Sequence, residues 1–327
     1  MDSHSSDVSG AGHLPSSRGP AAGVAECRGL RGPRSIWIPG GSFLMGSDHH
    51  YPDEAPSRRV SVAPFWMDAT AVTNADFAAF VEATGYITAA ERNAAGSSTV
   101  ANPQPARASG GRVFRKPTPG SAGAAAQWWA FVPGADWRCP HGPGDSTVEK
   151  PDHPVVQVTY ADAMAYARWA QKDLPTEAEW EFAARGGLEG AEYVWGNEFA
   201  PSGRHMANTW QGMFPWQDTA ADGYDGTAPV RSYPANGFGL YEMAGNVWEW
   251  TCDWYRQVAQ PDPESLVEVP LRRKVLKGGS YLSSPANCKR YRPAGRAPLR
   301  VDAAACDVGF RCVVRPAAVL ARAAGSH

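Results

Sequence analysis

The chain has 327 residues, of which 43% are hydrophobic, and its 34 glycines and 28 prolines indicate a backbone rich in turns. Its 31 basic and 33 acidic residues give a formal net charge of −2, which shows no bias toward nucleic acid or an anionic membrane. The sequence contains no run of about eighteen apolar residues, so we expect no membrane-spanning segment. Because the N-terminus lacks the apolar stretch of a signal peptide, we expect a cytoplasmic protein.

Composition divides the chain into one domain and two tails. Residues 1–33 are rich in Ser, Gly, Ala, Pro and Arg and lack a periodic apolar pattern, so we expect a disordered N-terminal tail. Residues 34–315 contain no convincing linker and are expected to form a single domain. A short C-terminal tail over residues 316–327 completes the predicted organisation.

The domain opens with alternating apolar residues. Residues 36–38 and 43–45, separated by the turn residues Pro39, Gly40 and Gly41, predict a hairpin of two short strands. Residues 59–67 predict a further strand.

Two helices are predicted next. Thr73 and Asp76 resemble a capping box, apolar residues follow at helical spacing, and Gly85 makes a plausible stop. A second helix is predicted over residues 161–171, where apolar residues share one face.

A third helix is predicted to begin at Thr176, whose hydroxyl can cap while Glu179 reaches back, and to end at Gly186. From about residue 187 onward the chain is rich in loops. Three helices, several short strands and long irregular stretches predict an α+β domain with little regular secondary structure. Long loops inside a compact domain are usually functional or held together by bound ions.

Residues 278–292 combine a glycine pair, neutral polar side chains and one cysteine. Ser280, Tyr281 and Asn287 supply polar groups near Cys288, and two arginines follow the cysteine. Nearby cations favour the thiolate, which is the reactive and metal-binding form. The alternative interpretation is a structural cysteine in a turn-rich strand pair with solvated arginines.

The other metal and nucleophile motifs are absent from the sequence. Six dispersed cysteines without a CxxC pair predict free thiols rather than a disulfide scaffold or a zinc site. The eight histidines show no HExxH or HxxxHxE pattern, so a histidine-based metal centre is not expected. The sequence also has no phosphate-binding glycine motif and no GxSxG elbow.

Two segments carry oxygen donors that suit a hard cation such as calcium. In residues 242–250, carboxylates flank a Gly-Asn turn, whose carbonyls add further oxygens. A similar set is formed by Asn208, Thr209, Asp222 and Tyr224. The alternative for both is ordinary Asx turns and solvated acids.

An ordered set of short motifs resembles the formylglycine-generating enzyme family over about residues 36–314. The motifs include IPGG at 38–41, PDHPV at 151–155, LPTEAEWE at 174–181, NTWQG at 208–212, GNVWEW at 245–250 and GFRC at 309–312. The resemblance implies a monomer with a single-domain fold that is distantly similar to C-type lectins and poor in secondary structure.

The resemblance also implies an activity. The family oxidises the cysteine of a CxPxR motif in an unfolded sulfatase polypeptide to Cα-formylglycine, using O₂ and an external thiol. Two enzyme cysteines hold Cu(I), an ion that soft thiolates select. Cys288 matches the second of these cysteines, whereas Ser283 stands at the position of the first. Because a hydroxyl is a hard, weak donor, we expect impaired copper binding and impaired turnover.

Three explanations of Ser283 are open. It is a deliberate Cys-to-Ser change, or it marks a natural paralogue with weaker or different activity, or another thiol compensates, for which Cys306 is the best candidate. The alternative function is a non-catalytic peptide-binding paralogue on the same calcium-stabilised scaffold. A non-heme iron sulfoxide synthase is disfavoured, because those enzymes carry an additional helical domain with a histidine triad.

The remaining site residues follow by motif from the resemblance. Ser280 matches a polar catalytic position, and the expected pocket residues are Trp248, Tyr281, Asn287, Arg296 and Asp307. The family binds two calcium ions, and the implied ligands are Asn208, Thr209, Asp222 and Tyr224 for one ion, and Glu242, Gly245, Val247 and Glu249 for the other.

Some positions depart from the family pattern. Asp307 replaces an Asn and Ser284 replaces a frequent His, whereas Asp302 falls on a matching polar position. Residues 90–122 do not follow the usual pattern in a region that shapes the substrate groove in relatives. Peptide specificity therefore stays open.

Overall fold

The computed structural model describes residues 34–92, 109–117, 128–256 and 272–316. The predicted N-terminal tail and all but the first residue of the predicted C-terminal tail lie outside these ranges, as does most of the departing region 90–122. In the described ranges no helix is long and apolar enough to cross a membrane.

Three α-helices begin at threonine capping boxes. The prediction at Thr73 is confirmed for α1 (Asn74–Thr84), and the prediction at Thr176 is confirmed for α3 (Glu177–Arg185). Both end, as predicted, at a glycine in the left-handed conformation. α2 (Tyr160–Trp169) starts one residue earlier and ends two residues earlier than predicted, and its cap is Thr159. Two 3-10 helices, η3 (Pro52–Glu54) and η5 (Pro201–Gly203), complete the helical elements of the described residues.

The described strands form four small sheets. One sheet has the order β1 (Ser35–Ile38), β4 (Phe65–Asp68), β11 (Val313–Val314), and another has the order β10 (Val308–Gly309), β7 (Trp248–Trp254), β8 (Arg273–Lys277), β9 (Arg296–Arg300). The two others pair β2 (Gly41–Met45) with β3 (Arg58–Val62) and β5 (Gly110–Phe114) with β6 (Trp129–Pro133). All pairs are antiparallel except β10 with β7. The predicted α+β class with little regular structure is confirmed.

The predicted hairpin over residues 36–45 is wrong, although both strands exist. β1 pairs with β4 and β2 pairs with β3, so the chain changes sheet at Gly40. Gly40 has φ of +69°, and a Cβ there would lie 2.5 Å from the Val62 carbonyl oxygen. The glycine is therefore needed for a close contact with the backbone of Val62 and not for a hairpin turn. The single strand predicted over 59–67 is likewise split into β3 and β4, because Pro64 between them cannot donate to a ladder.

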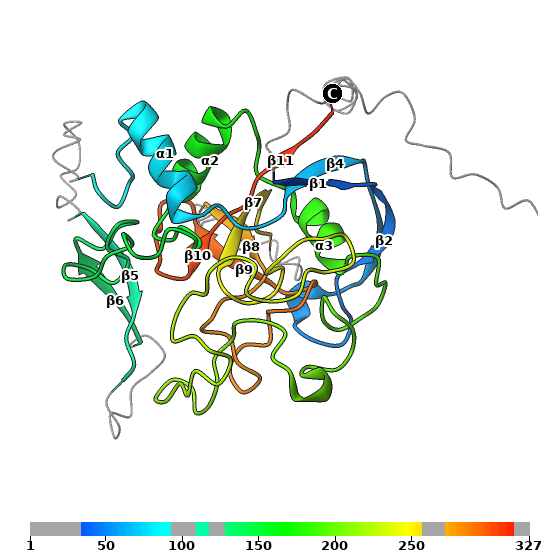
Figure 1. The fold of residues 1–327 in the computed structure, drawn as a ribbon. Coiled ribbons are helices and arrows are strands. Elements are labelled where there is room, and N and C mark those ends of the chain that lie inside the picture. Colours follow the sequence, from blue (N-terminus) through cyan, green and yellow to red (C-terminus); the bar gives the residue numbers. More distant parts are fainter. Residues whose placement is uncertain (1–33, 93–108, 118–127, 257–271, 317–327) are drawn as a thin grey trace, which may run out of the picture.

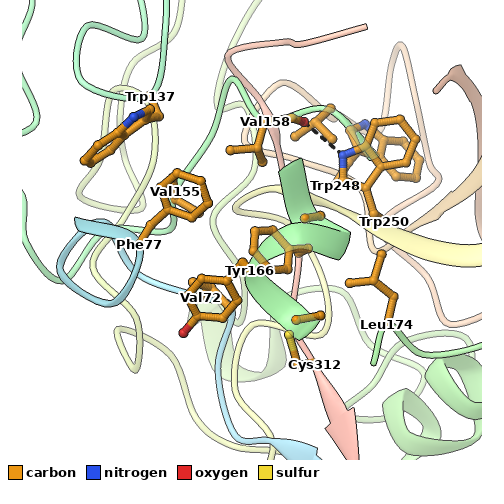
Figure 2. Close-up of a cluster of buried hydrophobic side chains, with 14 of the residues drawn as sticks. Val72, Phe77, Trp137, Val155, Val158, Tyr166, Leu174, Trp248, Trp250 and Cys312 are labelled. Atoms are coloured by element: carbon orange, nitrogen blue, oxygen red, sulfur yellow. Dashed lines mark hydrogen bonds between the residues drawn. The ribbon is translucent and has the colours of Figure 1, made fainter. Parts of the chain in front are cut away.

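Two clusters of buried side chains form the core. In the first cluster, the rings of Phe77, Tyr166 and Phe310 contact one another across α1, α2 and the segment after β10. Figure 2 shows Phe77 and Tyr166 from this cluster, together with the hydrogen bond from the Trp250 indole to the Val158 carbonyl oxygen at 3.0 Å. The second cluster packs α3 against β2 and β4. The two clusters hold the strands from which the loops of the site emerge.

The site segment leaves the end of β8. Gly279 has φ of +72°, and a Cβ there would lie 2.9 Å from the Cα of Tyr291, so only glycine lets the two backbones approach. In Figure 1 the long loops lie below the β7–β8–β9 strands, and the β5–β6 hairpin stands at the side of the molecule.

Candidate functional site

The segment after β8 folds back on itself and brings two predicted site residues together. The backbone N–H groups of Asn287 and Cys288 donate to the Ser284 carbonyl oxygen at 3.2 and 2.9 Å. The Ser283 hydroxyl accepts from the backbone N–H of Ser280 at 3.1 Å and lies close enough to the Cys288 thiol to lower the pKa of that thiol. The turn therefore places Ser283 and Cys288 close together.

The environment of Cys288 does not favour the thiolate as the sequence predicted. Burial raises the pKa of Cys288, and this effect exceeds the lowering by the charge and backbone N–H of Arg290. The guanidinium of Arg290 pairs instead with Asp53 at 2.9 Å, and that of Arg292 pairs with Glu54 at 2.8 Å. Because carboxylates neutralise both cations, the thiol stays protonated at neutral pH unless a metal displaces the proton.

A buried carboxylate stands beside the thiol. The Ser280 hydroxyl donates to Oδ2 of Asp307 at 2.9 Å, and the carbonyl oxygen of Asp307 accepts from the Trp248 backbone N–H at 2.8 Å. Burial raises the pKa of Asp307 to about 6, because the charged form loses its hydration. At neutral pH, Asp307 is therefore mostly ionised and holds the Ser280 hydroxyl as a donor.

Cys306 faces a different set of partners. Its sulfur accepts from the Tyr281 hydroxyl at 3.5 Å and from the Phe114 backbone N–H at 3.3 Å. Burial raises the pKa of Cys306 to about 12, so it is a protonated thiol at neutral pH. No interaction joins Cys306 to Cys288 among the residues that the structure describes, so the geometry gives no support to compensation by Cys306.

The other predicted pocket residues differ in their surroundings. Trp248 is buried in the first core cluster, against which Cys288 also packs, and the Asn287 side chain is exposed. The Arg296 guanidinium pairs with Glu177 at 2.8 and 3.0 Å and lines a separate cavity of about 600 Å³. Asp302 is exposed in the turn after β9, where it pairs with an arginine. The residues that the structure gathers are Ser280, Ser283, Cys288 and Asp307.

An aromatic cluster that the sequence interpretation missed borders this group. The Trp210 backbone N–H donates to the Ser283 carbonyl oxygen at 2.8 Å, and the Trp210 ring contacts those of Phe114 and Phe214 at 5.7 and 5.0 Å. Tyr281 belongs to the same cluster. The sequence signals for this cluster were the alternating pattern of residues 112–116 and the tryptophan pair at 128–129. Because these residues lie far from Cys288 along the chain, the sequence did not indicate that they border the site.

The first predicted calcium site has an unsatisfied oxygen. Oδ1 of Asn208 is buried and has no hydrogen-bond partner in the described structure. Asp222 accepts from the backbone N–H groups of Thr209 at 3.0 Å and Tyr224 at 3.2 Å, and burial raises its pKa. No group of three His, Cys, Asp or Glu side chains within the described residues could hold a metal ion, so amide and backbone oxygens would have to contribute. These oxygen donors fit a hard cation.

The second predicted calcium site fits in part. Oε2 of Glu242 is buried without a partner in the described structure, and burial raises the pKa of Glu242. Both oxygens of Glu249, in contrast, accept from the Arg311 guanidinium, at 3.0 and 2.7 Å. Gly245 lies directly against the backbone of Asn208, because a Cβ at Gly245 would lie 2.2 Å from the Asn208 carbonyl oxygen. The loops of the two predicted calcium sites therefore contact each other at this glycine. Glu242 is therefore available to a cation, whereas Glu249 is engaged in an ion pair.

The loop-rich α+β fold of this chain is shared by solved structures. PvdO from Pseudomonas aeruginosa matches with a TM-score of 0.58 at 25% identity, covering 86% of this chain and 94% of that chain. The family described as the sulfatase-modifying factor enzyme 1-like domain matches residues 21–316. The chain belongs to this family, that of the formylglycine-generating enzymes.

Curated relatives carry both active and inactive names. The chain is 48% identical to the formylglycine-generating enzyme of Thermomonospora curvata, over 86% of this chain and 93% of that protein. It is also 48% identical to the formylglycine-generating enzyme of Mycobacterium tuberculosis, over 85% and 97%. A Mus musculus protein named inactive C-alpha-formylglycine-generating enzyme 2 is 41% identical, over 86% and 85%. Overall similarity alone therefore does not fix the turnover of this chain.

Proposed function

We propose that this chain is a sulfatase-modifying oxidase that converts the cysteine of a CxPxR motif in an unfolded sulfatase to Cα-formylglycine, with turnover impaired by Ser283. The electrons for reducing O₂ come from the client cysteine and an external thiol. The observation that carries the proposal is the proximity of Ser283 to Cys288 in one turn, because these are the two positions at which the family resemblance implies copper-binding cysteines.

The residues present do not fit a two-thiolate Cu(I) site. Cys288 supplies one sulfur, whereas the hydroxyl of Ser283 is a hard donor that already accepts the Ser280 N–H. What the chain does supply is a small protected site: Asp307 fixes the Ser280 hydroxyl, and Trp210 fixes the backbone of Ser283. These contacts would hold the side chains of Ser280 and Ser283 in place for a client cysteine bound at Cys288.

A second candidate is a peptide-binding paralogue without redox chemistry. It is favoured by the single thiol, by the raised pKa of Cys288 and by the similarity to a relative named inactive.

The test is a turnover assay with a CxPxR peptide, Cu(I), O₂ and a thiol reductant, read by mass spectrometry. We expect slow aldehyde formation that is lost in Cys288→Ala, because Cys288 is the thiol of the site. Peptide binding without any conversion would support the binding paralogue. Equal conversion by Cys288→Ala would contradict a role of this thiol in the reaction.

We also propose that calcium stabilises the scaffold. Asn208 and Asp222, with the carbonyl oxygens of Thr209 and Tyr224, would hold one ion. Glu242 and the backbone oxygens of Gly245 and Val247 would contribute to a second ion, to which Glu249 adds an oxygen only if it shares its carboxylate with Arg311. The support is the two buried oxygens that lack partners in the described structure.

Removing calcium should therefore lower the thermal stability of the chain. A ligand at about 100 times its Kd stabilises the folded state by about 2.7 kcal/mol, so chelation should lower Tm by several degrees. Asn208→Ala should have a lower Tm and a smaller response to chelator than the unaltered chain, since it lacks a ligand of one of the two sites. The same Tm for the unaltered chain with chelator and with added calcium, in a thermal unfolding scan, would rule the sites out.

A further inference from the structure

One face of the β5–β6 hairpin is aromatic and basic. Successive strand residues point to opposite faces, so Arg112, Phe114 and Lys116 lie on the same side. In the register of the pair, Arg112 stands opposite Phe131 and Phe114 stands opposite Trp129. We call these five residues the hairpin face. The opposite side carries Val113, which is buried.

The hairpin face is continuous with the candidate site. Phe114 donates its backbone N–H to the Cys306 sulfur and packs its ring against Trp210 at 5.7 Å. Trp210 in turn donates its backbone N–H to the Ser283 carbonyl oxygen. A polypeptide that places a cysteine at Cys288 therefore has the hairpin face beside it.

The charge of this face is positive. The hairpin face carries Arg112 and Lys116, and the described residues 109–117 and 128–133 contain no acidic residue. Lys116 is neutralised in part by Asp225, 3.0 Å away. Arg112 is exposed, stacks over the Trp129 ring at 4.9 Å and has no ion pair among the described residues. Its guanidinium is thus held in place by an aromatic ring and free to bind an anion.

The neighbouring side chains suit a peptide carboxylate. The Phe131 ring, 52% exposed, lies across from Arg112 and would exclude water from a pair formed there. A planar guanidinium binds a carboxylate through two parallel hydrogen bonds. Partial burial by the rings makes such a pair stronger than one in open solvent. A client arginine at the same place would meet a like charge.

We propose that the hairpin face binds the client polypeptide beside its target cysteine and that Arg112 selects a carboxylate side chain there. The proposal rests on the proposed function for the identity of the client. It deepens that function, because it assigns the chain a preference for acidic residues flanking the modified cysteine.

The test measures binding and does not need turnover. Two labelled peptides carry a CxPxR motif with serine in place of the cysteine, one with glutamates and the other with lysines in the flanks. By fluorescence anisotropy we expect the glutamate peptide to bind about 10-fold more tightly, with a difference that shrinks at high salt. Arg112→Glu should reverse the preference, and Arg112→Lys should keep its sign but reduce its size, because an ammonium group cannot form the two parallel hydrogen bonds.

A matched control is Arg273→Glu. Arg273 is an exposed strand arginine at the start of β8, the end opposite the site segment, so its reversal should leave the preference unchanged. Equal Kd values for both peptides, or no measurable binding, would overturn the proposal. A dimer in sedimentation that Arg112→Glu abolishes would assign the face to a second copy and overturn it as well. Aldehyde formation, measured separately with cysteine peptides, reports on the proposed function alone.

Discussion

Ser283→Cys is expected to raise the affinity for Cu(I) by more than about 100-fold. Loss of groups that merely orient a metal ligand costs about 10- to 100-fold in affinity, so gain of a ligand atom should exceed that range. The new sulfur would replace the Ser283 hydroxyl, which lies close enough to the Cys288 thiol to lower its pKa, so the site would offer two soft donors to one copper ion. We expect the same variant to accelerate aldehyde formation on a CxPxR peptide.

Ser284→Cys is the matched control. Ser283 and Ser284 are neighbours with 2% exposure each, but the hydroxyl of Ser284 accepts from the backbone N–H of Asn287 and has no recorded contact with Cys288. A thiol at 284 should therefore bring no gain in Cu(I) affinity. Competition with a chromogenic Cu(I) chelator gives the Kd values. Equal values for Ser283→Cys and the unaltered chain would show that the site is not a copper site in this chain.

Local signals in the sequence predicted the helices well. The capping boxes at Thr73 and Thr176 and the stops at Gly85 and Gly186 depend on interactions within a few residues, and all four are confirmed. The predicted hairpin over 36–45 was wrong because the local residue pattern of a strand does not determine which other strand it pairs with. β1 and β2 have the right pattern for strands, but each finds a partner elsewhere in the chain.

The family motifs named candidate residues for the site, but the sequence could not predict their contacts. Ser283 and Cys288 were matched to family positions by motif, and the structure places them close together in one turn. The hydrogen bond between Ser280 and Asp307 joins residues 27 positions apart, and periodicity carries no information about such a contact. The influence of Arg290 on the thiol was overestimated, because the sequence does not show that Asp53 would take its charge.

Arg311→Met is expected to destabilise the fold by about 3–5 kcal/mol, the cost of breaking a buried ion pair at one partner. Arg311 and Glu249 are 0% and 1% exposed, and the guanidinium donates to both oxygens of the carboxylate. It also donates to the backbone carbonyl oxygens of Ala69 and Tyr241, which ties β7 to the end of β4 and to the loop before Glu242. Without Arg311, Glu249 keeps one strong donor, the Trp180 indole at 2.7 Å.

The size of the effect is measurable by chemical and thermal unfolding. At about 2–4 °C per kcal/mol for a domain of this size, Tm should fall by about 10 °C. Arg300→Met is the exposed control, because its pair with Asp302 is 46% and 45% exposed and should contribute less than about 1 kcal/mol. Adding Glu249→Gln to Arg311→Met should recover part of the loss, since it removes the stranded charge. A loss below about 1 kcal/mol in Arg311→Met would mean that water or a cation replaces the guanidinium.

Arg311→Met also distinguishes a purely structural role of the Arg311–Glu249 ion pair from an additional role in turnover. Glu249 follows Trp248, whose backbone N–H donates to the carbonyl oxygen of Asp307, so the ion pair holds the strand that positions the buried carboxylate. If the Arg311–Glu249 pair only stabilises the scaffold, Arg311→Met measured below its Tm should have the same peptide Kd and the same turnover rate per folded molecule as the parent chain. If it also fixes Asp307 against Ser280, turnover in the Ser283→Cys background should fall while peptide binding at the hairpin face stays unchanged. The two readouts differ because the hairpin face is held by Phe114 and Trp210, which do not contact Arg311 in the described structure.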